Sequence, residues 1–120
     1  MSQSSSLSND LLEMLPLSPA AFFVLFSLAD GDKHGYLIMQ EVKVLSDGKL
    51  RMGPATLYTT IQKLADQSFI EEVENDAQDR RRNYRLTRLG KQLLNVEFSR
   101  QSEVLLLAKT KKVFPLGDNA

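Results

Sequence analysis

The segment from Met52 to Gln67 constrains the fold of this chain more than any other. It opens with Gly53-Pro54, and proline suits the first position of a helix because its φ is already helical and its missing N–H is not needed there. Leu57, Ile61 and Leu64 then recur at the spacing of one helical face. The sequence therefore predicts a helix that buries a single apolar stripe.

The opposite face of this helix carries small and hydroxyl side chains where a surface helix usually carries more Glu, Lys and Arg. Small side chains let a helix approach the DNA major groove, and hydroxyl, amide and ammonium groups bind phosphates or base edges. Taken alone, the pattern fits a recognition helix and an ordinary exposed helix equally well. The DNA contacts that it predicts are Thr56, Tyr58, Thr59, Gln62 and Lys63, with Arg51 before the helix as a phosphate contact.

Composition excludes several classes of protein. A chain of 120 residues suits one small domain with one additional element. Cysteine is absent, and the one histidine, His34, has no cluster of carboxylates beside it, so we expect no disulfide, no metal site, no cofactor and no enzyme activity. Without a signal sequence or an apolar run long enough to span a membrane, we expect a cytoplasmic protein with no membrane partner.

The net charge of zero does not by itself indicate a nucleic-acid-binding protein. Its distribution is more informative, because residues 80–91 contain arginines and a lysine but no acid, whereas residues 10–47 are mainly acidic. Such a separation of charge attracts a polyanion locally.

Two further helices precede the key segment. Ser18-Pro19 is a cap followed by a first-turn proline, and Ala20–Ala29 is apolar almost all round, as expected of a helix in a core or beneath a partner. A second helix is predicted from about His34 to Leu45, with His34 at its start and Gly35 allowing close packing there. We expect Tyr36 to be a partly buried aromatic at the core edge. A polar helix that follows these elements completes a helix-turn-helix.

After Gln67 the periodicity changes from that of a helix to that of a strand. Residues 69–74 and 82–87 are two short strand-like segments, and in the second Tyr84 and Leu86 share one face. A hairpin directly after a helix-turn-helix is a wing, whose basic tip would follow a phosphate run or a minor groove. The predicted fold is mainly α with a small β-hairpin, a winged helix-turn-helix. The predicted wing contacts are Arg80, Arg81 and Arg82.

Thr87 can cap a last helix that runs from Arg88 to about Val113. A helix this long has nowhere in one small chain to bury its far half, so we expect it to pair with a second subunit. Alternatively, the last helix folds back onto Phe22–Leu28 of its own chain, and the same helix can make both contacts. We thus expect a mobile or briefly helical segment 1–16, a DNA-binding domain 17–87, a dimerisation helix 88–114 and a tail 115–120. The dimerisation residues are predicted to be Leu89, Leu93, Val96, Phe98, Val104, Leu105 and Leu107.

Residues 17–94 resemble the phenolic acid decarboxylase repressor (PadR) family of winged-helix regulators. The resemblance is carried by His34-Gly35-Tyr36, Gly53-Pro54-Ala55-Thr56-Leu57-Tyr58, Lys63-Leu64, Arg81-Arg82-Asn83-Tyr84-Arg85-Leu86-Thr87 and Gly90. It implies a dimer on pseudo-palindromic DNA, with Tyr58 and Lys63 at the DNA surface, and the single helix after the wing is similar to the short-tailed branch of the family. Thr59 and Ala55 depart from the proline and glycine that are common in the family, so details of base contact do not carry over.

The resemblance also implies a small hydrophobic effector, because some short-tailed members bind flat aromatic or cationic compounds between subunits and then release DNA. A corresponding cleft would be lined by Phe22, Phe26, Leu93, Val96 and Phe98, although a dimer core explains the same residues.

The sequence therefore predicts a homodimeric, sequence-specific transcriptional regulator that binds double-stranded DNA, most simply a repressor. If the two recognition helices enter successive major grooves, the half-sites should lie about 34 Å apart. If each subunit neutralises about three phosphates, log K should fall with log salt at a slope of about −5. A winged-helix module for protein-protein assembly, without DNA binding, is the alternative.

Overall fold

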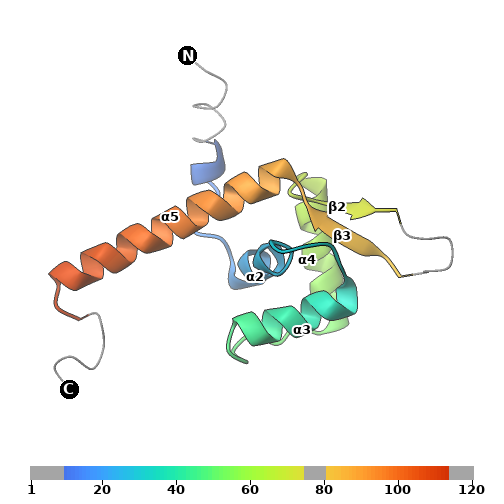
Figure 1. Ribbon diagram of the computed structural model, residues 1–120, viewed down its shortest axis with the longest axis horizontal. Coiled ribbons are helices and arrows are strands. Elements are labelled where there is room, and N and C mark those ends of the chain that lie inside the picture. The colour runs from blue at the N-terminus through green and yellow to red at the C-terminus, as the bar shows by residue number, and fades with distance from the viewer. Residues whose placement is uncertain (1–9, 75–80, 114–120) are drawn as a thin grey trace, which may run out of the picture.

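Three helices and a small antiparallel sheet pack together, and a fourth, longer helix runs across them and projects beyond (Figure 1). The computed structural model describes residues 10–74 and 81–113. Residues 10–12 are helical. The elements that follow are α2 (Pro19–Ser27), β1 (Lys33–His34), α3 (Gly35–Leu45), α4 (Pro54–Asp66), β2 (Ile70–Val73), β3 (Asn83–Leu86) and α5 (Arg88–Thr110).

The helix starts lie where the capping residues predicted them. The Ser18 hydroxyl accepts a hydrogen bond from the Ala21 N–H at 3.2 Å, and the Thr87 hydroxyl accepts one from Gly90 at 3.0 Å. His34 caps α3, since its Nδ1 accepts from the Leu37 N–H at 3.3 Å. The only histidine of the chain thus has the structural role at the helix start that the sequence favoured.

The helix ends differ slightly from the predicted ones. Helix α2 stops at Ser27, two residues before the predicted Ala29, because Leu28 and Ala29 continue only as a tighter turn with hydrogen bonds to the carbonyls three residues back. Helix α5 stops at Thr110, and Lys112 then adopts a positive φ of 62°. The predicted tail, 115–120, lies outside the described residues.

The predicted hairpin is present as β2 and β3, but the sheet has a third strand. Strand β1 pairs with β3 on the side away from β2, with Lys33 opposite Tyr84 and His34 opposite Asn83. The two-stranded hairpin of the sequence prediction is therefore corrected to a three-stranded sheet. A strand of two residues is too short to carry a period-two pattern, so the sequence could not reveal it.

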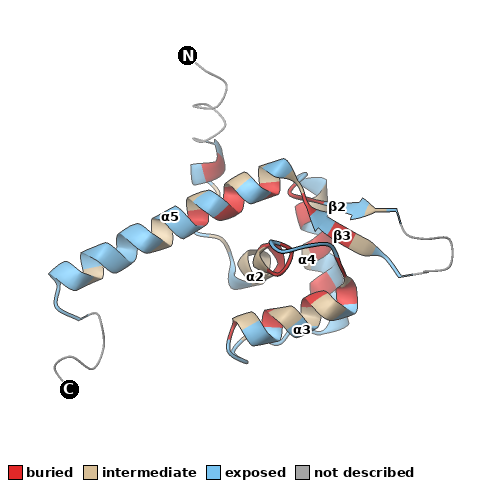
Figure 2. Cartoon of the chain, viewed as in Figure 1, coloured by how far each residue is buried: buried red, intermediate tan, exposed pale blue. Residues whose placement is uncertain are grey.

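The core lies where α2, α3, α4 and the start of α5 meet one face of the sheet (Figure 2). The predicted stripe of α4 is buried, as are Tyr84 and Leu86 on the inner face of β3. The other buried apolar residues include Val24, Leu25, Leu28, Ile38, Val42, Phe69, Ile70, Leu93 and Leu94. The winged helix-turn-helix fold predicted from the sequence is thus confirmed.

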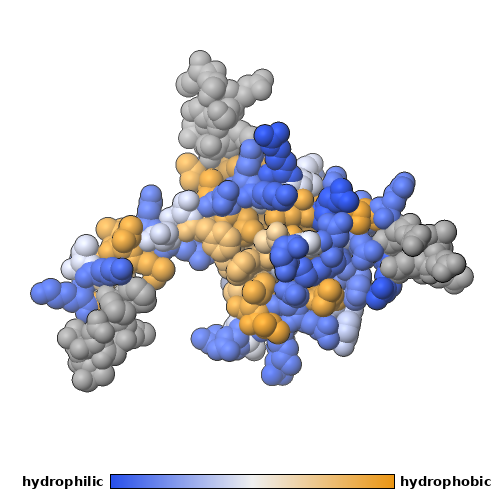
Figure 3. All heavy atoms as spheres, in the orientation of Figure 1, coloured by the Kyte–Doolittle hydropathy of each residue, from blue (hydrophilic) through white to orange (hydrophobic). Residues whose placement is uncertain are grey.

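Helix α5 has two halves with different surroundings. Its first half is buried at Gly90, Leu93, Leu94 and Glu97, whereas every residue from 102 to 107 is exposed (Figure 2). Hydrophobic side chains nevertheless gather on the projecting half (Figure 3). Among the described residues, no helix is both long and apolar enough to cross a lipid bilayer.

Candidate nucleic-acid interface

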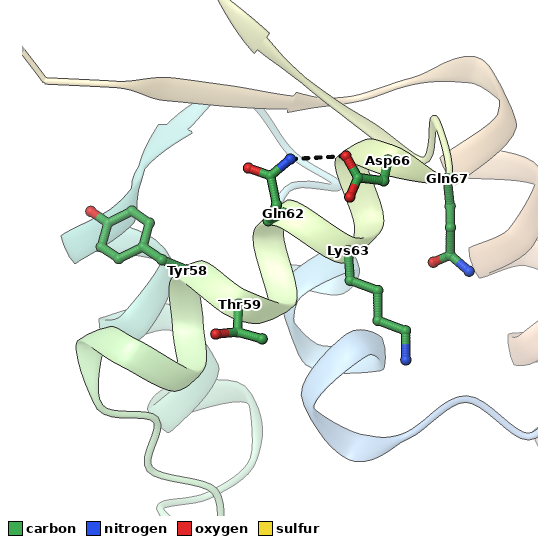
Figure 4. A pocket seen from close by; sticks show the side chains of 6 residues that line it. All are labelled: Tyr58, Thr59, Gln62, Lys63, Asp66 and Gln67. Atoms are coloured by element: carbon green, nitrogen blue, oxygen red, sulfur yellow. Dashed lines mark hydrogen bonds between the residues drawn. The ribbon is translucent and has the colours of Figure 1, made fainter.

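The outer face of α4 exposes the side chains that the sequence predicted to contact DNA. Thr56, Tyr58, Thr59, Gln62 and Lys63 are all exposed, while the opposite stripe of the helix is buried. Figure 4 shows Thr59 and Lys63 extending on one side of the helix and Gln62 on the other. This face is a continuous polar surface on a rigid helix, which is what a major groove accommodates.

Two hydrogen bonds hold parts of this surface in place. The Gln62 amide donates to the Asp66 carboxylate at 2.9 Å (Figure 4), and the Thr60 hydroxyl donates to the carbonyl of Thr56 at 2.8 Å. Tyr58, Thr59, Gln62 and Lys63 line a shallow hollow of about 580 Å³ along the helix. Asp66 lies on the same surface, so this part of the helix is not uniformly positive.

The basic residues of the wing are partly paired with acids. Arg82 Nε lies 3.9 Å from Glu72 Oε1, with both side chains largely exposed, and Arg85 lies 3.4 Å from Asp32. Exposed pairs of this kind are weak, so a phosphate can compete for the arginine. Arg51 and Arg81 are exposed, whereas the predicted contact Arg80 lies outside the described residues.

A second hollow, of about 300 Å³, connects the helix-turn-helix to the wing. It is lined by His34, Gly35, Tyr36, Tyr58, Arg81 and Arg82. The structure therefore brings the predicted helix contact Tyr58 together with two of the predicted wing arginines. It does not bring Arg51 to this hollow.

Gly35 explains how Tyr58 reaches this position. A Cβ atom at Gly35 would lie 2.5 Å from the Tyr58 hydroxyl oxygen and 3.0 Å from the ring carbon that bears it. The absence of a side chain at Gly35 thus lets the tyrosine ring pass over the start of α3, in agreement with the predicted close packing there.

Tyr36 differs from its prediction. It was expected to be partly buried at the core edge, but it is 62% exposed and lines the hollow beside Tyr58. The pairing of β1 with β3 explains the difference, because it draws the start of α3 to the edge of the domain next to the wing. No local pattern in the sequence signals this arrangement.

Tyr84 is the only buried tyrosine among the three of the chain. Burial raises the pKa of its phenol, and the nearby Glu72 carboxylate raises it further, while Arg82 partly opposes both effects. The hydroxyl therefore stays neutral at physiological pH and supports the inner face of the wing.

The predicted dimerisation residues fall into two groups. Leu93 is fully buried within its own chain and is a core residue, and Leu89 and Val96 are half-buried against the same core. Phe98 and the three residues of the projecting half, Val104, Leu105 and Leu107, are exposed by 36–65%. Only this second group leaves a large apolar surface for a partner.

Three of the five residues predicted to line a ligand cleft, Phe22, Phe26 and Phe98, form an aromatic cluster. The ring centroids of Phe22 and Phe26 lie 5.6 and 5.2 Å from that of Phe98, both in edge-to-face orientation. Val96 packs against the same core, while Leu93 lies beneath the surface. No group of three or more potential metal-ligating side chains occurs within the described ranges 10–74 and 81–113.

Comparisons with known proteins agree with this fold. Residues 24–96 match the model of the transcriptional regulator PadR-like family. An uncharacterised protein of Lysinibacillus sphaericus is 32% identical over 83 residues, which cover 68% of this chain and 76% of that protein.

Solved structures include a PadR family transcription regulator from Clostridium difficile, with 18% identity, a TM-score of 0.66, and coverage of 78% of this chain and 97% of that one. Bacillus subtilis PadR in complex with operator DNA shows 26% identity and a TM-score of 0.55, over 62% of this chain and 44% of that one. The winged helix-turn-helix fold agrees with a family match that covers more than half of the chain, and this match shows that the chain belongs to the PadR-like family of transcriptional regulators.

Proposed function

We propose that this protein is a homodimeric repressor that binds a pseudo-palindromic operator in the cytoplasm. The observation that carries the proposal is the exposed face of α4, where five polar or aromatic side chains project from a helix whose other face is locked in the core. In the proposed complex α4 enters the major groove, Arg51 binds a phosphate, and the wing arginines follow the flanking backbone.

The second subunit is proposed to cover the projecting half of α5. Val104, Leu105, Leu106 and Leu107 are exposed by 48–65%, and a helix that leaves four consecutive apolar side chains in water favours association. A double variant, Leu105→Glu/Leu107→Glu, should sediment as a monomer at concentrations where the wild-type protein sediments as a dimer. Lys109→Glu, which changes an already exposed and charged position of the same helix, is the matched control.

An effector of small hydrophobic character is proposed to act at the aromatic cluster of Phe22, Phe26 and Phe98. These rings are half-buried or exposed and lie where α2 meets α5, so a compound that inserts there would alter the packing of α5 on the DNA-binding domain. Phe98→Ala should weaken the response of DNA binding to such a compound without removing DNA binding itself.

The experiment that tests DNA binding is in vitro selection of duplex fragments from the source genome, including the DNA upstream of this protein's own gene. We expect an inverted repeat with half-sites about 34 Å apart. Lys63→Ala should weaken binding uniformly across sequences and reduce the salt slope by about 1 for each subunit, whereas Lys109→Ala should change neither. If no fragment is enriched, and Lys63→Ala changes nothing measurable, the alternative of a protein-protein assembly module is favoured.

A further inference from the structure

The hollow beside the start of α3 exists because of the short strand β1. Pairing of His34 with Asn83 places residues 81 and 82, which precede β3, next to the first turn of α3. Tyr58 reaches the same place from α4 by passing over Gly35. Three separate parts of the chain therefore line one hollow of about 300 Å³.

The lining of this hollow is suited to an anion. None of the six described residues that line it is acidic, and they combine two guanidinium groups, of Arg81 and Arg82, with the phenols of Tyr36 and Tyr58. Guanidinium groups bind phosphate oxygens through paired N–H donors, and phenols add single O–H donors. The N-terminal end of α3 adds the partial positive charge of a helix start.

We propose that this hollow seats one phosphate group of the DNA backbone in each half-site. In this arrangement Arg82 and Arg81 neutralise the phosphate, Tyr36 and Tyr58 donate to its oxygens, and the His34 cap holds the start of α3 in position. The inference rests on the proposed function and adds Tyr36 to the DNA-binding residues. It also assigns Tyr58 to the backbone rather than to base edges.

In this arrangement Glu72 competes with the phosphate for Arg82. Its carboxylate lies 3.9 Å from Arg82 Nε, with the two side chains 56% and 73% exposed, so DNA must draw Arg82 away from an exposed ion pair. Glu72→Gln removes that competition. We therefore expect this variant to bind DNA a few-fold more tightly than the wild-type protein, whereas substitutions in the hollow weaken binding.

The test is a coupling measurement between single residues and single phosphates. The selected operator duplex is compared with duplexes in which one phosphate at a time is replaced by an uncharged methylphosphonate. Arg82→Gln should raise Kd on the natural duplex about tenfold, and one methylphosphonate position in each half-site should cost the wild-type protein about as much. At that position the two losses should not add, because both remove the same contact.

Control variants distinguish this phosphate site, called the seat below, from a general loss of positive charge. Tyr36→Phe removes one hydroxyl and should show the same non-additive pattern at the same position with a smaller loss, of about threefold. For Lys63→Ala, by contrast, the loss of affinity caused by that methylphosphonate should add in full to the loss caused by the substitution. Circular dichroism checks that each variant is folded, as expected for exposed positions.

Three outcomes decide between the possibilities. The seat is supported if the losses of affinity from Arg82→Gln and from Tyr36→Phe each fail to add to the loss from a methylphosphonate at one and the same phosphate. Additive losses at every phosphate, with operator binding intact, overturn the seat but leave the proposed function standing. A wild-type protein that binds no duplex at all overturns the proposed function, and the phosphate seat with it.

Discussion

Gly90, in the first turn of α5, is the position where one added methyl group should have the largest effect on stability. A Cβ atom there would lie 2.1 Å from the carbonyl oxygen of Phe69 and 2.8 Å from a methyl carbon of Leu86. Real Cβ atoms essentially never lie closer than 3.0 Å to another heavy atom, so the helix and the turn before β2 would have to move apart. The obstacle is backbone, which cannot rotate away.

The same junction is held by hydrogen bonds that the separation would break. The Thr87 N–H donates to the Phe69 carbonyl at 3.1 Å, and the Thr87 hydroxyl donates to the Ser68 carbonyl at 2.6 Å. Each contributes about 1 kcal/mol, and overpacking adds about 1–3 kcal/mol. Alanine regains about 1 kcal/mol through its higher helix propensity. Gly90→Ala should therefore lower the free energy of unfolding by about 2–4 kcal/mol.

Urea denaturation followed by circular dichroism measures this change, at one fixed protein concentration because subunit association would shift the midpoint. Asn95→Ala is the matched control, since Asn95 is exposed on the same helix and its substitution should leave stability within about 0.5 kcal/mol or raise it slightly. A Gly90→Ala protein that unfolds at the same urea concentration as the wild type, or at a higher one, would refute the reasoning.

Three further predictions concern other parts of the molecule. Glu97→Ala should lower the free energy of unfolding by about 2–4 kcal/mol. It removes a buried side chain and deprives the Leu17 N–H of the carboxylate to which it donates at 2.8 Å. Glu103→Ala, at an exposed position, should change the free energy of unfolding by no more than about 0.5 kcal/mol. Gly35→Ala should displace Tyr58 and weaken operator binding about tenfold while the denaturation midpoint changes little, since a side chain rather than backbone gives way. The raised pKa of Tyr84 means that the folded state holds the phenol proton more tightly than the unfolded state does. The contribution of this group to stability is therefore complete below the ordinary pKa of 10.0 and is lost as pH rises beyond it. An ultraviolet titration should show one phenol that ionises at higher pH than the others, and Tyr84→Phe should remove it.

The parts of the fold that the sequence predicted are those with local causes. Ser18-Pro19, Gly53-Pro54 and Thr87 mark helix starts through the chemistry of a few adjacent residues, and the structure places α2, α4 and α5 there. The alternation around Tyr84 and Leu86 likewise identified the inner face of a strand. Periodicity and capping act over one or two turns, so they can be recognised without knowledge of the rest of the chain.

The parts that were missed depend on residues far apart in the sequence. No pattern in the sequence singled out Glu97, yet it is buried and accepts a hydrogen bond from a residue 80 positions earlier. Tyr36 was expected at the core edge, and only the pairing of β1 with β3 places it in an exposed hollow with Arg81 and Arg82. The sequence predicted the DNA-contacting residues one by one. Only the structure shows which of them lie together on the surface.

The two-residue strand β1 also has a consequence for the order in which the domain forms and opens. Its pairing with β3 joins His34 to Asn83, positions far apart in the chain, through only two residue pairs. A contact with so long a loop and so few bonds forms late in folding and opens at a lower free energy than the helical core around it. In hydrogen exchange, the backbone amides of this strand should therefore exchange before those of α2, and binding of DNA across the junction should slow them selectively.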